Sequence, residues 1–153
     1  MTAPSARLRE LGIELPKVAA PAGAYIPARR SGNLVFTAGQ VPFVDGTLAA
    51  TGKVGAEVGV EQARDLARTC ALNALAAVDA LVGLDAVTGV VKVVGFVASA
   101  PGFTAQPAVI NGASDLFGEV FGEAGAHARS AVGVAELPMN APVEVEIIVE
   151  VGG

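Results

Sequence analysis

One arginine stands out among the residues that could take part in chemistry. Arg129 lies in 128–137, a predicted β-strand that is otherwise mostly Ala, Val, Gly and Ser. A guanidinium is poorly placed in such a strand unless it holds an anion, and its planar fork matches the two oxygens of a carboxylate. Two interpretations stay open: Arg129 binds a small carboxylate, or it forms an ion pair with an acidic residue at a subunit boundary.

Three glutamates share one face of a second predicted strand, 143–151. Glu144, Glu146 and Glu150 are separated by even numbers of positions, and side chains at that spacing point to the same side of a strand. A carboxylate that is half-buried at an interface could orient or deprotonate a water molecule. Solvated charges on the edge of a sheet are the alternative interpretation.

Two polar residues accompany these charged groups. His127, the only histidine, precedes Arg129 by two positions and shares its face if the strand is regular. It could shuttle a proton, or it could be a surface residue at the end of the strand. Asn111 lies near the start of a predicted helix, where the sequence favours a helix cap over a polar residue of a pocket.

The sequence lacks the motifs of several common kinds of active site. Ser130 has neither a second histidine nor a G-x-S-x-G context, which argues against a serine triad. No Walker lysine loop or strand-borne G-x-G-x-x-G is present to hold a nucleotide. Cys70 falls on the apolar stripe of a predicted helix, and one Cys with one His is too few for a tetrahedral metal site, so we expect no metal.

Composition limits the partners of the chain. Ten Lys and Arg against fifteen Asp and Glu give a net charge of −5, the wrong sign for binding nucleic acid. The N-terminus lacks the apolar core of a signal peptide and the apolar segments are too short to span a bilayer, so we expect a cytoplasmic protein without membrane contact. With 52% hydrophobic and only 16% charged residues, part of the outer surface is expected to be buried in an oligomer.

The elements that must position these side chains follow from periodicity. We expect an arm at 1–20 followed by a single domain at 21–153. Within the domain the patterns predict a hairpin (25–28 and 34–38), an irregular connection (41–58) that could form a lid, a helix (60–81), a strand (87–99), a second helix (108–121) and a closing hairpin (128–137 and 143–151). The order β-β-α-β-α-β-β indicates an α+β fold with the helices on one face of a mixed sheet.

The closing hairpin has a geometric consequence for the candidate site. If its turn is centred near Asn140, Glu136 lies opposite Glu144. Arg129 then lies seven residues farther along its strand, or about 23 Å away. Arg129 and Glu144 could therefore meet only where neighbouring subunits come together.

Several segments, taken in order, resemble the RidA/YjgF family, also called the endoribonuclease L-PSP family. The matching stretches are 22–25, 34–42, 91–97 and 128–134, with 137–138 and 143–146. The resemblance implies a chorismate-mutase-like fold whose mixed sheet, with two helices on one face, assembles into a homotrimeric barrel with pockets at the subunit interfaces. It also implies hydrolysis of reactive enamines and imines, such as 2-aminoacrylate, to a 2-keto acid and ammonia without metal or organic cofactor.

The resemblance also implies roles for particular residues. Arg129 would clamp the carboxylate of the substrate, and Glu144 of the adjacent chain would position the attacking water. Tyr25, Gly39 and Asn111 would line the pocket. Ala131 would also contact the substrate, at a position where the family often has Cys.

The chain departs from the shorter members of the family in other ways. His127 stands where they often have Pro, and 8–17 and 46–59 are additions. These departures concern the identity of the substrate more than the presence of the site. Two alternative functions stay open: a trimer that binds small carboxylates or metabolites without turnover, as a sensor or chaperone-like protein, and an endoribonuclease, which the acidic composition disfavours.

Overall fold

The computed structural model describes residues 2–21 and 23–153. Ala22, at the start of the matching stretch 22–25, and Met1 lie outside the described residues. The helices are α1 (Pro4–Glu10), α2 (Val60–Val82) and α3 (Gln106–Phe121), and the strands are β1 (Ala28–Ser31), β2 (Leu34–Thr37), β3 (Phe43–Val44), β4 (Thr47–Leu48), β5 (Val87–Ala98), β6 (Ala128–Val134) and β7 (Val143–Val151). Three single 3-10 turns complete the elements: η1 (Leu84–Ala86), η2 (Gly122–Gly125) and η3 (Pro138–Asn140).

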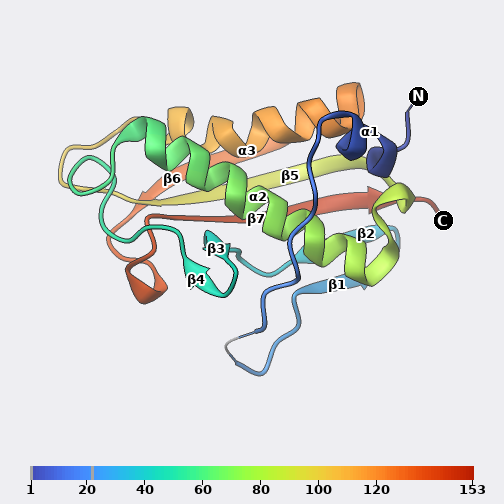
Figure 1. Cartoon of the computed structure of the whole chain (residues 1–153), viewed down its shortest axis with the longest axis horizontal. Coiled ribbons are helices and arrows are strands. Elements are labelled where there is room, and N and C mark those ends of the chain that lie inside the picture. Colours follow the sequence, from blue (N-terminus) through green and yellow to red (C-terminus); the bar gives the residue numbers. More distant parts are fainter. Residues whose placement is uncertain (1, 22) are drawn as a thin grey trace.

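Five strands form one mixed sheet in the order β1-β2-β7-β5-β6. β5 and β6 run parallel, and the other neighbours run antiparallel. α2 and α3 lie side by side over one face of this sheet (Figure 1). The predicted α+β architecture with both long helices on one face is therefore confirmed.

The longest helix forms where the apolar spacing predicts it. The expected range was 60–81 and α2 covers Val60–Val82, ending at Gly83, whose φ of 79° does not suit a helix. Its apolar stripe packs against the sheet and against α3. A Cβ at Gly112 of α3 would lie 2.0 Å from the backbone oxygen of Arg64 in α2, so the two helices approach this closely only because a glycine stands there.

The two faces of the sheet have different surroundings. In β7 alternate side chains are buried beneath the helices, which leaves the three glutamates Glu144, Glu146 and Glu150 on the opposite face. Apolar side chains stand on that open face beside them. Phe36 and Val132 are 41% and 44% exposed there.

The predicted closing hairpin is wrong. β6 and β7 do not pair with each other, because β5 lies between them and pairs with both. The proline-rich turn at 138–142 does reverse the chain, but α3 returns the chain across the sheet, so β6 pairs in parallel with β5. The order β5-α3-β6 is a βαβ unit, which was the sequence signal for this arrangement.

Two smaller expectations change in the first part of the chain. The first hairpin exists, but β1 begins at Ala28 and includes 29–31, which were expected in the turn. The turn itself is Gly32 and Asn33, with Gly32 at φ 60°. The connection at 41–58 is not wholly irregular, because β3 and β4 form a small hairpin within it.

Leu8 of α1 is buried in the main core. Within residues 2–21 and 23–153, no helix combines the length and apolar character needed to cross a bilayer.

Candidate functional site

Arg129 extends from the edge strand β6 toward α3. Its Nη1 donates hydrogen bonds to Asn111 Oδ1 at 2.7 Å and to Ser114 Oγ at 3.2 Å. These two acceptors are three positions apart and therefore lie on the same face of α3. The interpretation of Asn111 as a helix cap is wrong, because the N-cap is Ala105 and Asn111 lies inside the helix.

A chain of hydrogen bonds continues from Arg129 to His127. Ser114 Oγ lies 2.8 Å from His127 Nε2, and His127 Nδ1 lies 2.6 Å from the carbonyl oxygen of Gly125. Because a carbonyl only accepts, Nδ1 must carry a proton, and in the neutral ring Nε2 then accepts from the Ser114 hydroxyl. Ser114 in turn accepts from Arg129, so every donor in the chain is assigned. His127 is half-buried and packs edge-on against Phe117 at 5.9 Å, which is not the environment of a free surface residue.

Arg129 forms no ion pair with any described residue. Across residues 2–21 and 23–153 the ion pairs involve Arg7, Lys53, Arg64 and Arg68 as cations, and none involves Arg129. Both side-chain partners of Arg129 are neutral, and its Nε and Nη2 donate to no described residue. One edge of the guanidinium is therefore held while the other is left to receive an anion.

Glu144 lies on the open face of the sheet against Gly39. Gln40 and Val145 exchange backbone hydrogen bonds of 2.8 and 2.9 Å, which brings the chain at Gly39 alongside the glutamate. A Cβ at Gly39 would lie 1.8 Å from Glu144 Oε1, so the carboxylate occupies space that only glycine leaves open. Tyr25, which is 50% exposed, borders the same cleft of about 370 Å³.

The environment of Glu144 changes its acidity. Burial raises the pKa of this carboxyl above its ordinary value, and the charge of Glu146 on the same strand raises it further. No hydrogen bond from the described part of the chain opposes this effect. A carboxylate with a raised pKa and no fixed donor is suited to accept a proton from water and to return it.

The two clusters lie apart in a single chain. Arg129 pairs with Val93, which faces the helices, and Glu144 pairs with Phe96, which faces the open side. They are thus on opposite faces, with β5 between them. Two strand spacings and three residues along β5 separate their Cα atoms by roughly 14 Å, which replaces the distance expected from the hairpin.

The structure therefore sorts the predicted site residues into two groups. Tyr25, Gly39 and Glu144 border one cleft, and Asn111 lies with Arg129 at the far side of the sheet. Ala131, two positions beyond Arg129 on the same face, packs partly against the hydrophobic core.

Sequence reasoning missed three contributors to these groups. Ser114 links Arg129 to His127, and its position three residues after Asn111 on α3 was the available signal. Gln40 fixes Gly39 by pairing with β7, and Met139 borders the cleft from the turn η3. No sequence signal connects Met139 with Glu144, because only the path of the chain after β6 brings them together.

Cys70 is a core residue, as the sequence indicates. Its side chain is fully buried, and its thiol donates to the carbonyl of Val143 at 3.7 Å. Burial raises the pKa of the thiol well above its ordinary value, and the nearby charge of Glu144 adds to the effect. The thiol is therefore neutral and unsuited to act as a nucleophile. Among the described residues, no three His, Cys, Asp or Glu side chains gather closely enough to hold a metal ion.

Comparisons with known proteins cover nearly the whole chain. Residues 5–151 match the model of a family described as "YjgF/chorismate mutase-like, putative endoribonuclease". Protein TCP17 of Trypanosoma cruzi is 48% identical over 148 residues, which are 95% of this chain and 92% of that protein.

Solved structures are also similar over most of the chain, as two examples show. A protein of Shewanella oneidensis described as a "putative endoribonuclease" is 33% identical with a TM-score of 0.93, and the match covers 98% of this chain and 100% of that one. TdcF of Escherichia coli, solved with bound serine, is 26% identical with a TM-score of 0.66, covering 89% of this chain and 94% of that one.

Proposed function

The chain belongs to the YjgF/chorismate mutase-like family, and we propose that it is a hydrolase of reactive enamines and imines derived from amino acids. The products are a 2-keto acid and ammonia. One observation carries the proposal: Arg129 is oriented by two neutral side chains while its charge is left without a carboxylate partner in the described chain. A guanidinium held in this way is prepared for the carboxylate of a ligand.

The second half of the site comes from another copy of the chain. Arg129 lies at an edge strand and Glu144 in a cleft on the opposite face, so the two act together across an interface. The open face of the sheet supports such an assembly, because Phe36, Val94, Phe96, Val132 and Ile148 place apolar side chains there. A homotrimer closes the three sheets around these side chains and forms three equivalent sites.

The reaction requires little beyond positioning. Arg129 fixes the carboxylate of the substrate, and its imine carbon is electrophilic once the nitrogen is protonated. Glu144 accepts a proton from a water molecule as the water oxygen bonds to that carbon. The carbinolamine nitrogen then takes the proton back from Glu144, which restores the carboxylate. Ammonia leaves as the C–N bond breaks, and the hydroxyl oxygen forms the carbonyl of the 2-keto acid and gives its proton to water.

The bound serine of TdcF fits a family site for small carboxylates. Serine has the carboxylate, the nitrogen and the three-carbon skeleton of 2-aminoacrylate. Serine is nevertheless compatible with binding alone, so a trimer that holds small carboxylates without turnover is the second candidate. The two candidates differ in whether Glu144 does chemistry.

The test is the release of pyruvate from freshly generated 2-aminoacrylate. We expect a rate well above that in buffer, and loss of this excess in both Arg129→Ala and Glu144→Gln. Pyruvate binding that Glu144→Gln retains, together with no turnover by the native protein, would favour the binding function. RNA cleavage by highly purified protein that Arg129→Ala abolishes would instead favour the endoribonuclease named in the family description.

A further inference from the structure

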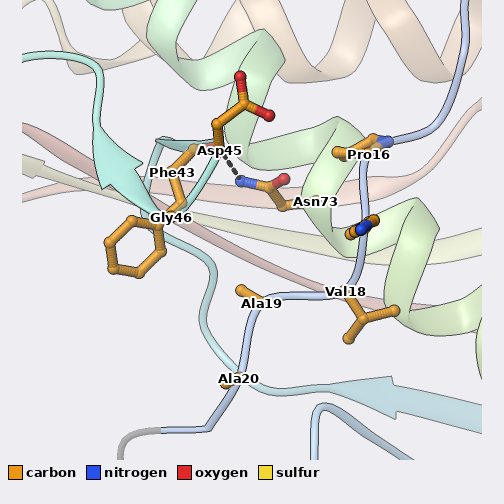
Figure 2. A pocket seen from close by; sticks show the side chains of 9 residues that line it. Pro16, Val18, Ala19, Ala20, Phe43, Asp45, Gly46 and Asn73 are labelled. Atoms are coloured by element: carbon orange, nitrogen blue, oxygen red, sulfur yellow. Dashed lines mark hydrogen bonds between the residues drawn. The ribbon is translucent and has the colours of Figure 1, made fainter.

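A second cavity lies next to the cleft of Glu144. It has a volume of about 580 Å³, against about 370 Å³ for the cleft itself. Figure 2 shows its walls: the segment 16–20 on one side, and the β3–β4 turn with Asn73 of α2 on the other. Its size is that of a small-molecule site.

The cavity and the cleft share three lining residues. Ala19, Ala20 and Phe43 border both. Because residues 19 and 20 are both alanines, only their methyl side chains stand at the boundary between the cavity and the cleft. A ligand anchored over Glu144 could therefore extend past Phe43 into the second space.

One buried acceptor faces this second space. Asn73 is only 3% exposed, and its Nδ2 donates to the carbonyls of Val41 and Phe43 at 3.1 Å each. Because Nδ2 must face these two acceptors, the orientation of the amide is fixed and Oδ1 points the other way, toward the segment 16–20 (Figure 2). No described residue donates to Oδ1, and no fully enclosed side-chain oxygen or nitrogen lacks a partner, so Oδ1 lies at the cavity surface.

The chemistry of the cavity selects a type of ligand. Its walls are mostly apolar, from Pro16, Val18 and Phe43, while the charged Lys17 and Asp45 are exposed at the rim. The Asn73 carbonyl oxygen at the cavity surface has no donor among the described residues, so a ligand hydroxyl or amide N–H can donate to it. The interior thus matches an apolar chain that ends in a neutral hydrogen-bond donor.

We propose that this cavity is a side-chain subsite of the same active site, and that the preferred substrates are imines of amino acids with a long apolar side chain ending in a hydroxyl or amide. The inference rests on the proposed function. It adds a preference for longer substrates. 2-Aminoacrylate has no side chain beyond its methylene and would leave this subsite empty.

The test compares three imines generated in place by an L-amino-acid oxidase or from serine. They are 2-aminoacrylate, the imine of norleucine, and the imine of its ω-hydroxy analogue. We expect the highest kcat/KM for the hydroxy compound, about fivefold above norleucine because of the bond to Asn73.

Val18→Trp fills the cavity from a partly exposed position and should lower the kcat/KM ratio of the hydroxy imine to 2-aminoacrylate at least tenfold. Val44→Trp is the matched control, since Val44 is 49% exposed on β3 and lines neither the cavity nor the cleft. It should leave the ratio as it is in the native chain.

The outcomes separate the two claims. The subsite proposal is wrong if 2-aminoacrylate is hydrolysed with no preference for the longer imines. It is also wrong if the kcat/KM ratio of the hydroxy imine to 2-aminoacrylate is the same in the two tryptophan variants. In both cases the proposed function stands. If no imine is hydrolysed, the proposed function fails, and calorimetry with the 2-keto acid of the hydroxy compound decides the cavity. If Val18→Trp weakens this binding and Val44→Trp does not, the cavity is a binding site. If both variants bind equally well, the cavity is not a binding site.

Discussion

The cation and the carboxylate of the candidate site are held in opposite ways. Arg129 is fixed at one end by Asn111 and Ser114, and Ser114 is fixed in turn by His127. Glu144 has no hydrogen-bond donor from the described residues and sits half-buried over Gly39 with a raised pKa. Under the proposed function this difference predicts a division of roles: the fixed cation orients the ligand, and the loosely held carboxylate exchanges protons.

This division predicts that the two residues fail differently. Arg129→Ala should raise KM for 2-aminoacrylate roughly 100-fold to 1,000-fold, because the ligand carboxylate loses its charged partner. Glu144→Gln should lower kcat by roughly 100-fold or more and change KM little. Steady-state kinetics give both parameters, with Arg30→Ala on the exposed strand β1 as the control. Equal losses in KM for both variants would contradict the division.

Gly39→Ala should disturb the carboxylate alone. The added Cβ would overlap Glu144 Oε1, the end of a flexible side chain, so Glu144 must move while the fold stays intact. We expect kcat to fall on the order of 10-fold to 100-fold with little change in melting temperature. Gly118→Ala, where a Cβ meets nothing within 4 Å, is the control and should keep native activity.

A melting temperature lowered as far by Gly39→Ala as by a core substitution would contradict this account. Gly95→Ala provides that reference, because its Cβ would lie 2.4 Å from Ile110 in the core.

Ser114→Ala should loosen the arginine without removing it. The guanidinium keeps Asn111 but loses the link to His127, so we expect KM to rise about tenfold with kcat nearly unchanged. Ser31→Ala on β1 serves as the control. A variant with native KM would show that the hydrogen-bond chain does not orient Arg129.

The smallest expected effect concerns pH. If the Glu144 carboxylate is the base, activity falls as pH drops through its pKa, and the raised pKa places this loss at a higher pH than for an ordinary glutamate. Glu146→Gln removes the second cause of the raised pKa, so the acidic limb of the kcat profile should move to lower pH. A limb that stays in place would mean that Glu144 is not the group observed.

Local patterns predicted the long helices and the main strands but not which strands pair, and they missed the short hairpin of β3 and β4. The spacing of apolar residues predicts α2 almost to the residue, and the Val-rich run predicts β5, because both signals depend on short stretches of chain. The pairing of β6 and β7 was wrong because turn residues such as Pro138 and Pro142 show that the chain reverses, not which strands then pair.

The candidate site was predictable residue by residue but not as a geometry. Arg129 and Glu144 are unusual in their strands and could be found from the sequence. Ser114 had only its spacing from Asn111 as a signal. Asn73 had none, because an asparagine within a helix is an ordinary residue until tertiary packing gives it partners. The cavity at 16–20 depends on where the segment after α1 lies across α2, which no local pattern specifies (Figure 1).

The central claim is that one site takes Arg129 from one chain and Glu144 from another. Co-expression of Arg129→Ala with Glu144→Gln tests it most directly, since mixed assemblies contain interfaces in which both residues are native. For equal, random mixing in a trimer we expect about a quarter of the native pyruvate-forming activity, although each variant alone is nearly inactive. Mixed assemblies, verified by mass, that are no more active than the single variants would contradict the claim.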